Sequence, residues 1–190
     1  LLAGGLRRQA VFMIAGIIPP GAKNVNLSPG KGFLQLTSGL KCGMLKMIGK
    51  IRWGGNAMNT AQLQTFCTEV RRDIINMTAN AGSGHPGGSL SAVELMSAIF
   101  CTQMRIDPKN PKDPDRDRFV LSKGHAAPCY YGILAELGFF SKDEFKTFRQ
   151  LHGMLQGHPD MKKIPGVDAS TGSLGQGISL AVGMALGAKH

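Results

Sequence analysis

A short apolar run, Phe119-Val120-Leu121, lies between stretches of helical periodicity and constrains the fold more than any other feature. Consecutive apolar residues without alternation are typical of a strand buried on both faces of a parallel sheet. Apolar residues at steps of three and four, with their end signals, predict helices at residues 59–80, 91–103, 127–137, 141–150 and 174–189. Helices that alternate with a buried strand predict an α/β domain with a doubly wound, mostly parallel sheet.

The expected ends of these helices follow from familiar terminal residues. Asn59 or Thr60 can cap the first helix, and Ser141 with Glu144 three residues later forms a capping box for the helix over 141–150. Residues 151–173 are marked by Gly and Pro and are expected to form a loop. The sequence stops at His190 directly after a predicted helix, where such a domain would place its next strand, so we expect the sheet to be incomplete at the C-terminus.

The charge distribution divides the chain at residue 57. Residues 1–57 carry eight basic groups and no acidic one, whereas residues 58–190 carry 14 basic and 12 acidic groups. The first segment also lacks a helical or strand period. It could be a targeting peptide, a basic tail that contacts anionic surfaces, or disordered or non-native upstream sequence before a protein that begins at Met58. We favour the third interpretation and place the functional domain at residues 58–190.

Composition excludes several classes of protein. The 43% share of apolar residues can fill a core, and no apolar stretch is long enough to cross a bilayer. The four cysteines are far apart and form no CxxC pair, which argues against a disulfide framework or zinc knuckle and favours a reducing, cytoplasmic location. Because most of the basic excess lies in residues 1–57, we expect neither nucleic acid nor a membrane as the partner of the domain.

Three of the five histidines directly follow a glycine at a predicted turn or strand end: His85, His125 and His158. Glycine permits a tight turn, and the proline after His85 and His158 restricts the backbone of each histidine. One such histidine would be read as an ordinary loop residue. Three in the same context, with His125 at the carboxyl end of a strand, indicate a functional site. His152 lacks this context.

A glycine-rich run, Thr171 to Gly177, opens the last predicted helix. Bare amides at a helix N-terminus favour an anionic or strongly polar ligand. The run is neither a Walker A loop nor a dinucleotide fingerprint. Close helix packing explains the glycines about as well as ligand binding does.

Four ordered motifs resemble the amino-terminal part of transketolases across about residues 59–190. They are SGHPGG at 83–88, FVLSKGHA at 119–126, GHPD at 157–160, and PGVD at 165–168 running into TGSLGQG at 171–177. The resemblance implies thiamine diphosphate and Mg²⁺ as cofactors, and transfer of a two-carbon ketol unit between sugar phosphates.

The same resemblance assigns roles to individual residues. His85 and His158 match histidines that meet the substrate near its reacting oxygens, and are the expected catalytic residues. His125 matches a histidine that contacts the cofactor diphosphate. Gly172, Ser173 and Leu174 match a loop whose backbone holds the aminopyrimidine of the cofactor. Imidazoles in these places can donate hydrogen bonds and move protons near neutral pH.

The departures from the family pattern are as informative. The family's Mg²⁺ ligands and its cofactor-activating glutamate would lie beyond residue 190, so no metal ligand is assigned here. The resemblance therefore implies a C-terminal transketolase subunit or domain as partner, together with homodimerisation, and an inactive chain on its own. The open alternatives are another thiamine enzyme such as deoxyxylulose-phosphate synthase, a non-catalytic binding module, and nucleic-acid or membrane binding through residues 1–57.

Overall fold

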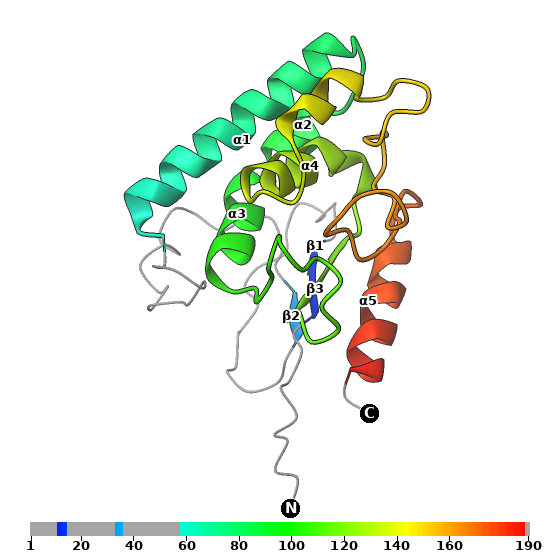
Figure 1. Cartoon of the computed structure of the whole chain (residues 1–190). Helices are drawn as coiled ribbons and strands as arrows, with labels where there is room; N and C mark the ends of the chain where they lie inside the picture. The colour runs from blue at the N-terminus through cyan, green and yellow to red at the C-terminus, as the bar shows by residue number, and fades with distance from the viewer. Residues whose placement is uncertain (1–10, 15–32, 36–57, 189–190) are drawn as a thin grey trace, which may run out of the picture.

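A computed structural model describes residues 58–188, together with the backbone of two short segments, 11–14 and 33–35. In these described residues, five α-helices and two 3₁₀ segments pack around a small sheet (Figure 1). In chain order the elements are β1 (Val11–Ile14), β2 (Phe33–Gln35), α1 (Thr60–Asn80), α2 (Pro86–Leu90), α3 (Val93–Thr102), β3 (Arg118–Leu121), η2 (Gly124–Ala126), α4 (Ala127–Glu136), η3 (Lys142–Thr147) and α5 (Gln176–Gly187).

Successive side chains of β3 pack against two different layers of helices. Phe119 and Leu121 belong to the main core, which they share with buried side chains of α1, α3 and α4. Val120, between them, packs with Ala169 and with Ala181 of α5 in a second, smaller cluster. This alternation is the period of a strand, and it places α5 on the opposite face of the sheet from the other helices (Figure 1).

The long helix α1 follows the predicted apolar stripe. Leu63, Phe66, Val70, Ile74 and Met77 are all buried on one face. Asn59 caps the helix by accepting a hydrogen bond from the Gln62 amide, and the Gln62 side chain accepts one from the Asn59 amide. The helices predicted over 91–103, 127–137 and 174–189 are also present, with ends that differ by at most two residues.

The helix predicted over 141–150 is wrong in type and in length. Residues 142–147 form the 3₁₀ segment η3, and Ser141 caps it by accepting from the Asp143 amide. Phe148 has a non-helical ψ of 125° and Arg149 has a φ of 61°, so the chain leaves the helical path there. Only Phe145 of η3 is buried, and a single apolar anchor gives an α-helix little face to bury.

A second difference concerns residues 1–57, where no strand was predicted. Here β1 pairs in parallel with both β2 and β3, giving the order β2-β1-β3. The run Val11-Phe12-Met13-Ile14 has the apolar, partly β-branched composition of a buried parallel strand, but it was too short to stand out in an aperiodic segment. The rest of residues 1–57, including Cys42, lies outside the described residues.

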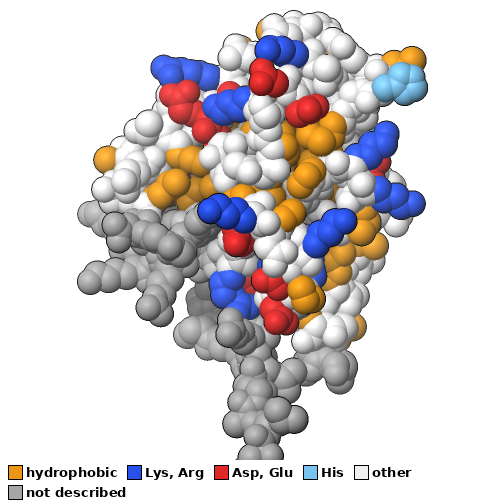
Figure 2. Space-filling model, in the orientation of Figure 1, with side chains coloured by type: hydrophobic (Ala, Val, Ile, Leu, Met, Phe, Trp, Pro, Cys, Tyr) orange, Lys and Arg blue, Asp and Glu red, His pale blue; other side chains and the backbone are white. Residues whose placement is uncertain are grey.

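The surface of the described part is mixed in charge. Basic and acidic side chains are interspersed on the face in Figure 2, and apolar side chains lie exposed along the side that α5 occupies. Across residues 58–188 no helix is both long enough and apolar enough to cross a membrane. Cys67, Cys101 and Cys129 are free and buried.

Candidate active site

His85 is the residue on which the short helix α2 begins. Its carbonyl accepts hydrogen bonds from both the amide (3.2 Å) and the hydroxyl (3.0 Å) of buried Ser89. Pro86 occupies the first turn, where its missing N–H costs nothing. The His85 backbone is therefore fixed by α2, while its side chain is exposed.

His125 follows directly from the end of β3. It sits in η2, and its ring lies edge-on to that of His85 with 5.3 Å between centroids. The preceding Gly124 is needed for close backbone packing, because a Cβ there would lie 2.7 Å from the Thr171 carbonyl oxygen. Gly88 is similarly close to His125, with 3.2 Å from a Cβ to the ring.

Lys123 joins the two histidine-bearing segments. Its Nζ donates to the Gly88 carbonyl (2.8 Å) and contacts the Ser91 hydroxyl at 3.2 Å. Burial lowers the pKa of Lys123. Burial also lowers the pKa of His125, with further lowering from the positive charges of His85, Lys123 and His158. A neutral His125 close to a lysine ammonium is an environment that favours an anionic ligand.

His158 lies against the glycine-rich loop. A Cβ at Gly172 would be 3.4 Å from the His158 ring, so glycine allows the loop to run past the imidazole. Thr171 ties this loop to the sheet, because its hydroxyl donates to the Leu121 carbonyl (2.7 Å).

Asp168 holds the chain that leads into this loop. Its buried carboxylate contacts Arg116 (2.6 Å) and Arg118 (3.2 Å) and accepts from the Phe119 amide (2.8 Å). The 165–171 segment is thereby fixed to the start of β3, while Thr171 binds its end.

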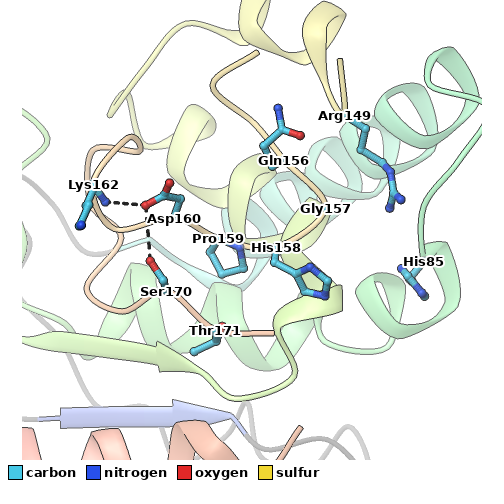
Figure 3. Close-up of a pocket in the computed structure, with 10 residues that line it drawn as sticks. All are labelled: His85, Arg149, Gln156, Gly157, His158, Pro159, Asp160, Lys162, Ser170 and Thr171. Atoms are coloured by element: carbon cyan, nitrogen blue, oxygen red, sulfur yellow. Dashed lines mark hydrogen bonds between the residues drawn. The ribbon is translucent and has the colours of Figure 1, made fainter. Parts of the chain in front are cut away.

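A pocket of about 760 Å³ opens in front of these loops (Figure 3). His85, Arg149 and His158 point into the same space at one end, and Lys162, Asp160 and Ser170 lie at the other. The pocket thus combines imidazoles that can move protons with cations that can hold an anion.

The structure brings together most of the residues singled out in the sequence. His85, His125, His158 and Gly172 form one cluster. Ser173 and Leu174 continue the same loop, but both are exposed, and Leu174 is 57% accessible. Sequence reasoning did not assign Lys123 or Arg149. Lys123 stood inside a quoted motif, but only the fold shows that it reaches α2, and no sequence signal marked the left-handed turn at Arg149.

A sequence family described as "Transketolase, thiamine diphosphate binding domain" matches residues 63–190. The chain belongs to the transketolase family. The resemblance found in the sequence motifs is therefore confirmed.

Curated relatives include both split and single-chain transketolases. The chain is 46% identical over 124 residues to a 6-deoxy-6-sulfo-D-fructose transketolase subunit of Clostridium sp. strain MSTE9, covering 65% of this chain and 45% of that protein. It is 44% identical over 128 residues to human transketolase, covering 67% and 20%. The chain thus spans less than half the length of these relatives.

Solved transketolases share the fold. A Pichia stipitis enzyme in complex with sedoheptulose 7-phosphate aligns with a TM-score of 0.61 at 40% identity, covering 65% of this chain and 18% of that one. The enzyme of Campylobacter jejuni aligns with a TM-score of 0.61 at 38% identity, covering 66% and 20%.

The site residues fit the organic cofactor that the transketolase domain binds. Helix α5 begins on left-handed Gly175, has no side-chain cap and has no acidic residue in its first turn, so no nearby carboxylate offsets the positive end of its helix dipole. With His125 and Lys123, this positive helix end suits an anionic heteroaromatic molecule. For a metal the fit is absent: within residues 58–188 no three His, Cys, Asp or Glu side chains come together.

Proposed function

We propose that this chain is the thiamine-diphosphate-binding component of a transketolase that transfers a two-carbon ketol unit between sugar phosphates. One observation carries the proposal: three loops distant in sequence place His85, His125 and His158 around one site, against the Gly172 backbone. Scattered imidazoles would have removed the basis for it.

Each residue can then be given a task. Thiamine diphosphate, when bound, supplies the nucleophilic carbon and the electron sink of ketol transfer. His125 and Lys123 would hold its diphosphate, and the amides of Gly172, Ser173 and Leu174 would hold its aminopyrimidine. We assign no Mg²⁺ ligand to this chain.

His85 and His158 would act on the sugar. Both line the pocket and both are exposed to it. An imidazole N–H there can donate to the substrate carbonyl oxygen as negative charge develops on it, and can return or remove a proton at the neighbouring hydroxyl. The backbone of His85 is fixed by α2, and the ring of His158 contacts the Gly172 loop. Little reorganisation is therefore needed for either to act.

The remaining expectations concern the larger assembly. We propose that residues 58–190 are the native domain, and that its sheet is a doubly wound, mostly parallel one that continues beyond β3. Exposed apolar residues on α5 support a C-terminal transketolase subunit or domain as partner and homodimerisation. Free buried cysteines support a cytoplasmic location.

The activity is tested on the chain completed with the remainder of a matching transketolase subunit and mixed with the C-terminal subunit of a two-subunit transketolase. The mixture is expected to convert xylulose 5-phosphate and ribose 5-phosphate when thiamine diphosphate and Mg²⁺ are present. His158→Ala should lower the rate by about 10²–10⁴-fold, the usual effect of removing a proton-transferring side chain. His152→Ala is the matched control and should leave the rate unchanged.

Two outcomes would favour the alternatives. Turnover of pyruvate with glyceraldehyde 3-phosphate instead would indicate a deoxyxylulose-phosphate synthase. Ketol transfer that is unaffected by His158→Ala would indicate that this chain only binds its partner.

A further inference from the structure

We infer that Tyr131, on α4, is a positioning residue whose hydroxyl fixes the stretch of chain that carries His158 into the pocket. The inference rests on the proposed function, because His158 is the residue through which Tyr131 would affect ketol transfer. The Tyr131 hydroxyl donates a hydrogen bond of 2.8 Å to the Gln156 carbonyl. His158 follows two residues later and lines the pocket (Figure 3). Tyr131 itself is buried and is not part of the pocket lining, so it can act on the site only through the chain it holds.

The helix that carries Tyr131 is a rigid support for this bond. Residues 127–135 of α4 are all buried, so the helix is enclosed by the core. The Tyr131 ring packs edge-on against the ring of Phe148, with 6.2 Å between centroids. Tyr131 therefore contacts the 148–158 loop at both ends, with its ring at Phe148 and its hydroxyl at Gln156. A side chain locked by packing in this way holds its hydrogen-bond partner in one place.

The loop is braced internally but has few attachments to the rest of the domain. The Arg149 amide donates to the Leu155 carbonyl (2.8 Å), and the Gln156 side chain donates to two carbonyls of the same turn, each at 2.8 Å. These bonds make the turn one unit. Within the described part of the chain, the Tyr131 bond is the only hydrogen bond that ties residues 155–159 to anything outside this turn. Loss of the hydroxyl should therefore let the turn shift together with the histidine that follows it.

The Tyr131 hydroxyl stays a donor over the whole pH range in which the protein would work. Burial raises the pKa of Tyr131, and the negative charge of nearby Asp160 raises it further. A phenol that keeps its proton cannot exchange it with a substrate near neutral pH. Tyr131 therefore holds His158 in place and takes no part in proton transfer.

The neighbouring Tyr130 makes the same kind of bond at a different place, and so provides a matched control. Its hydroxyl donates to the Gly166 carbonyl (3.0 Å), and it is as deeply buried as Tyr131. The chain after Gly166 has a second anchor, because the Asp168 carboxylate pairs with buried Arg116 at 2.6 Å. Loss of the Tyr130 hydroxyl should therefore leave the site where it is.

NMR of the full chain tests the position of His158 without any turnover. The His158 ring is near enough to Gly172 for a nuclear Overhauser effect between the ring proton Hδ2 and the Gly172 α-protons. We expect Tyr131→Phe to remove most of this effect, which falls steeply with distance, and Tyr130→Phe to leave it unchanged. Both variants should lower the unfolding midpoint by similar amounts, because each loses one buried hydrogen bond and keeps its ring.

Kinetics of the completed chain, mixed with the C-terminal subunit, give the second measurement. Tyr131→Phe should lower kcat by roughly 10–10²-fold, the order of loss expected when a reacting group is misplaced. The dissociation constant of thiamine diphosphate should stay unchanged, because the bond lies away from His125. In a His158→Ala background, Tyr131→Phe should have no further effect, because the two residues act as one unit.

Each result supports or overturns the inference. It is overturned if Tyr131→Phe keeps the His158 to Gly172 effect, if Tyr130→Phe removes it equally, or if Tyr131→Phe lowers kcat by the same factor with and without His158. A completed wild-type enzyme that transfers no ketol unit would contradict the proposed function instead. The NMR comparison of the two tyrosine variants would then still decide whether Tyr131 positions His158.

Discussion

At the scale of single residues, Gly124 shows how closely two loops approach at the site. A Cβ at Gly124 would meet backbone atoms of Thr171 and Gly172 at 2.7 to 2.9 Å, and backbone cannot rotate away as a side chain can. We expect Gly124→Ala to lower the free energy of unfolding by roughly 1–3 kcal/mol, the usual cost of overpacking. It should also weaken binding of thiamine diphosphate by separating His125 from the 171–174 loop.

Chemical denaturation and a cofactor titration measure both effects. Gly87→Ala is the matched control, because a Cβ there meets no atom within 4 Å and α2 favours alanine over glycine. Equal stability of the two variants would show that the loops are not in contact.

His125 yields a prediction about pH. Burial and the nearby positive groups lower its pKa in the folded chain below the ordinary value. Above the unfolded pKa of about 6.5 the residue is neutral in both states. As the pH falls below that value the unfolded chain binds the proton first, so the free energy of unfolding decreases. NMR titration of the His125 ring gives its folded pKa directly.

Measurements of the free energy of unfolding against pH test the same predicted decrease. His125→Asn should flatten the loss of stability as the pH falls below about 6.5, whereas His152→Asn should not. A ring that titrates above 6.5 would contradict the cluster of positive groups around it. When a diphosphate binds, its negative charge should raise the pKa of His125.

At the scale of elements, Asp168 connects the site loop to the sheet. Its carboxylate is 2% exposed and lies between Arg116, which is also buried, and Arg118. We expect Asp168→Ala to lower the free energy of unfolding by roughly 3–5 kcal/mol, because the Arg116 charge would remain buried without a partner. Thermal unfolding measures the change.

An exposed ion pair provides the comparison for Asp168. Glu69 pairs with Arg72 on the surface of α1, and Glu69→Ala should leave the unfolding midpoint nearly unchanged. If both variants unfold at the same temperature, the buried pair does not fix the loop.

Sequence patterns predicted those elements whose signals are local. The apolar stripe and the N-terminal cap of α1 depend only on residues near one another in the sequence, and both are present where the sequence predicts them. The α2 helix was missed because five residues with two glycines carry no period, and it forms where Pro86 and Ser89 fix its first turn. Residues 142–147 had a good cap but one apolar anchor, so the cap alone did not decide between α and 3₁₀.

The site residues that could be predicted from the sequence are those that share a local sequence pattern. The three Gly-His pairs pointed to His85, His125 and His158, and the fold brings all three together. Lys123 and Arg149 were not predictable in this way, because their significance depends on what lies across space. Lys123 reaches a carbonyl on α2, and Arg149 lines the pocket only because the chain makes a left-handed turn at that residue.

At the scale of the whole molecule, α5 is the helix that leaves most of its apolar side chains exposed in the described part of the chain. It contains no charged residue, and only Gly177 and Ala181 are buried, while Leu180, Val182 and Leu186 are 41–55% exposed. An uncharged helix with several exposed aliphatic side chains favours association. We expect the chain to self-associate as its concentration rises, and the double variant Leu180→Glu/Leu186→Glu to shift it toward monomer.

Sedimentation velocity measures this equilibrium, and α1 supplies the control. Ile75 is 48% exposed but lies on a helix whose surface is otherwise largely polar, so Ile75→Glu should leave association unchanged. Addition of a C-terminal transketolase subunit should compete with self-association if it covers the same face. A chain that stays monomeric at all concentrations, or a double variant that associates as strongly as the wild type, would show that α5 is not the associating surface.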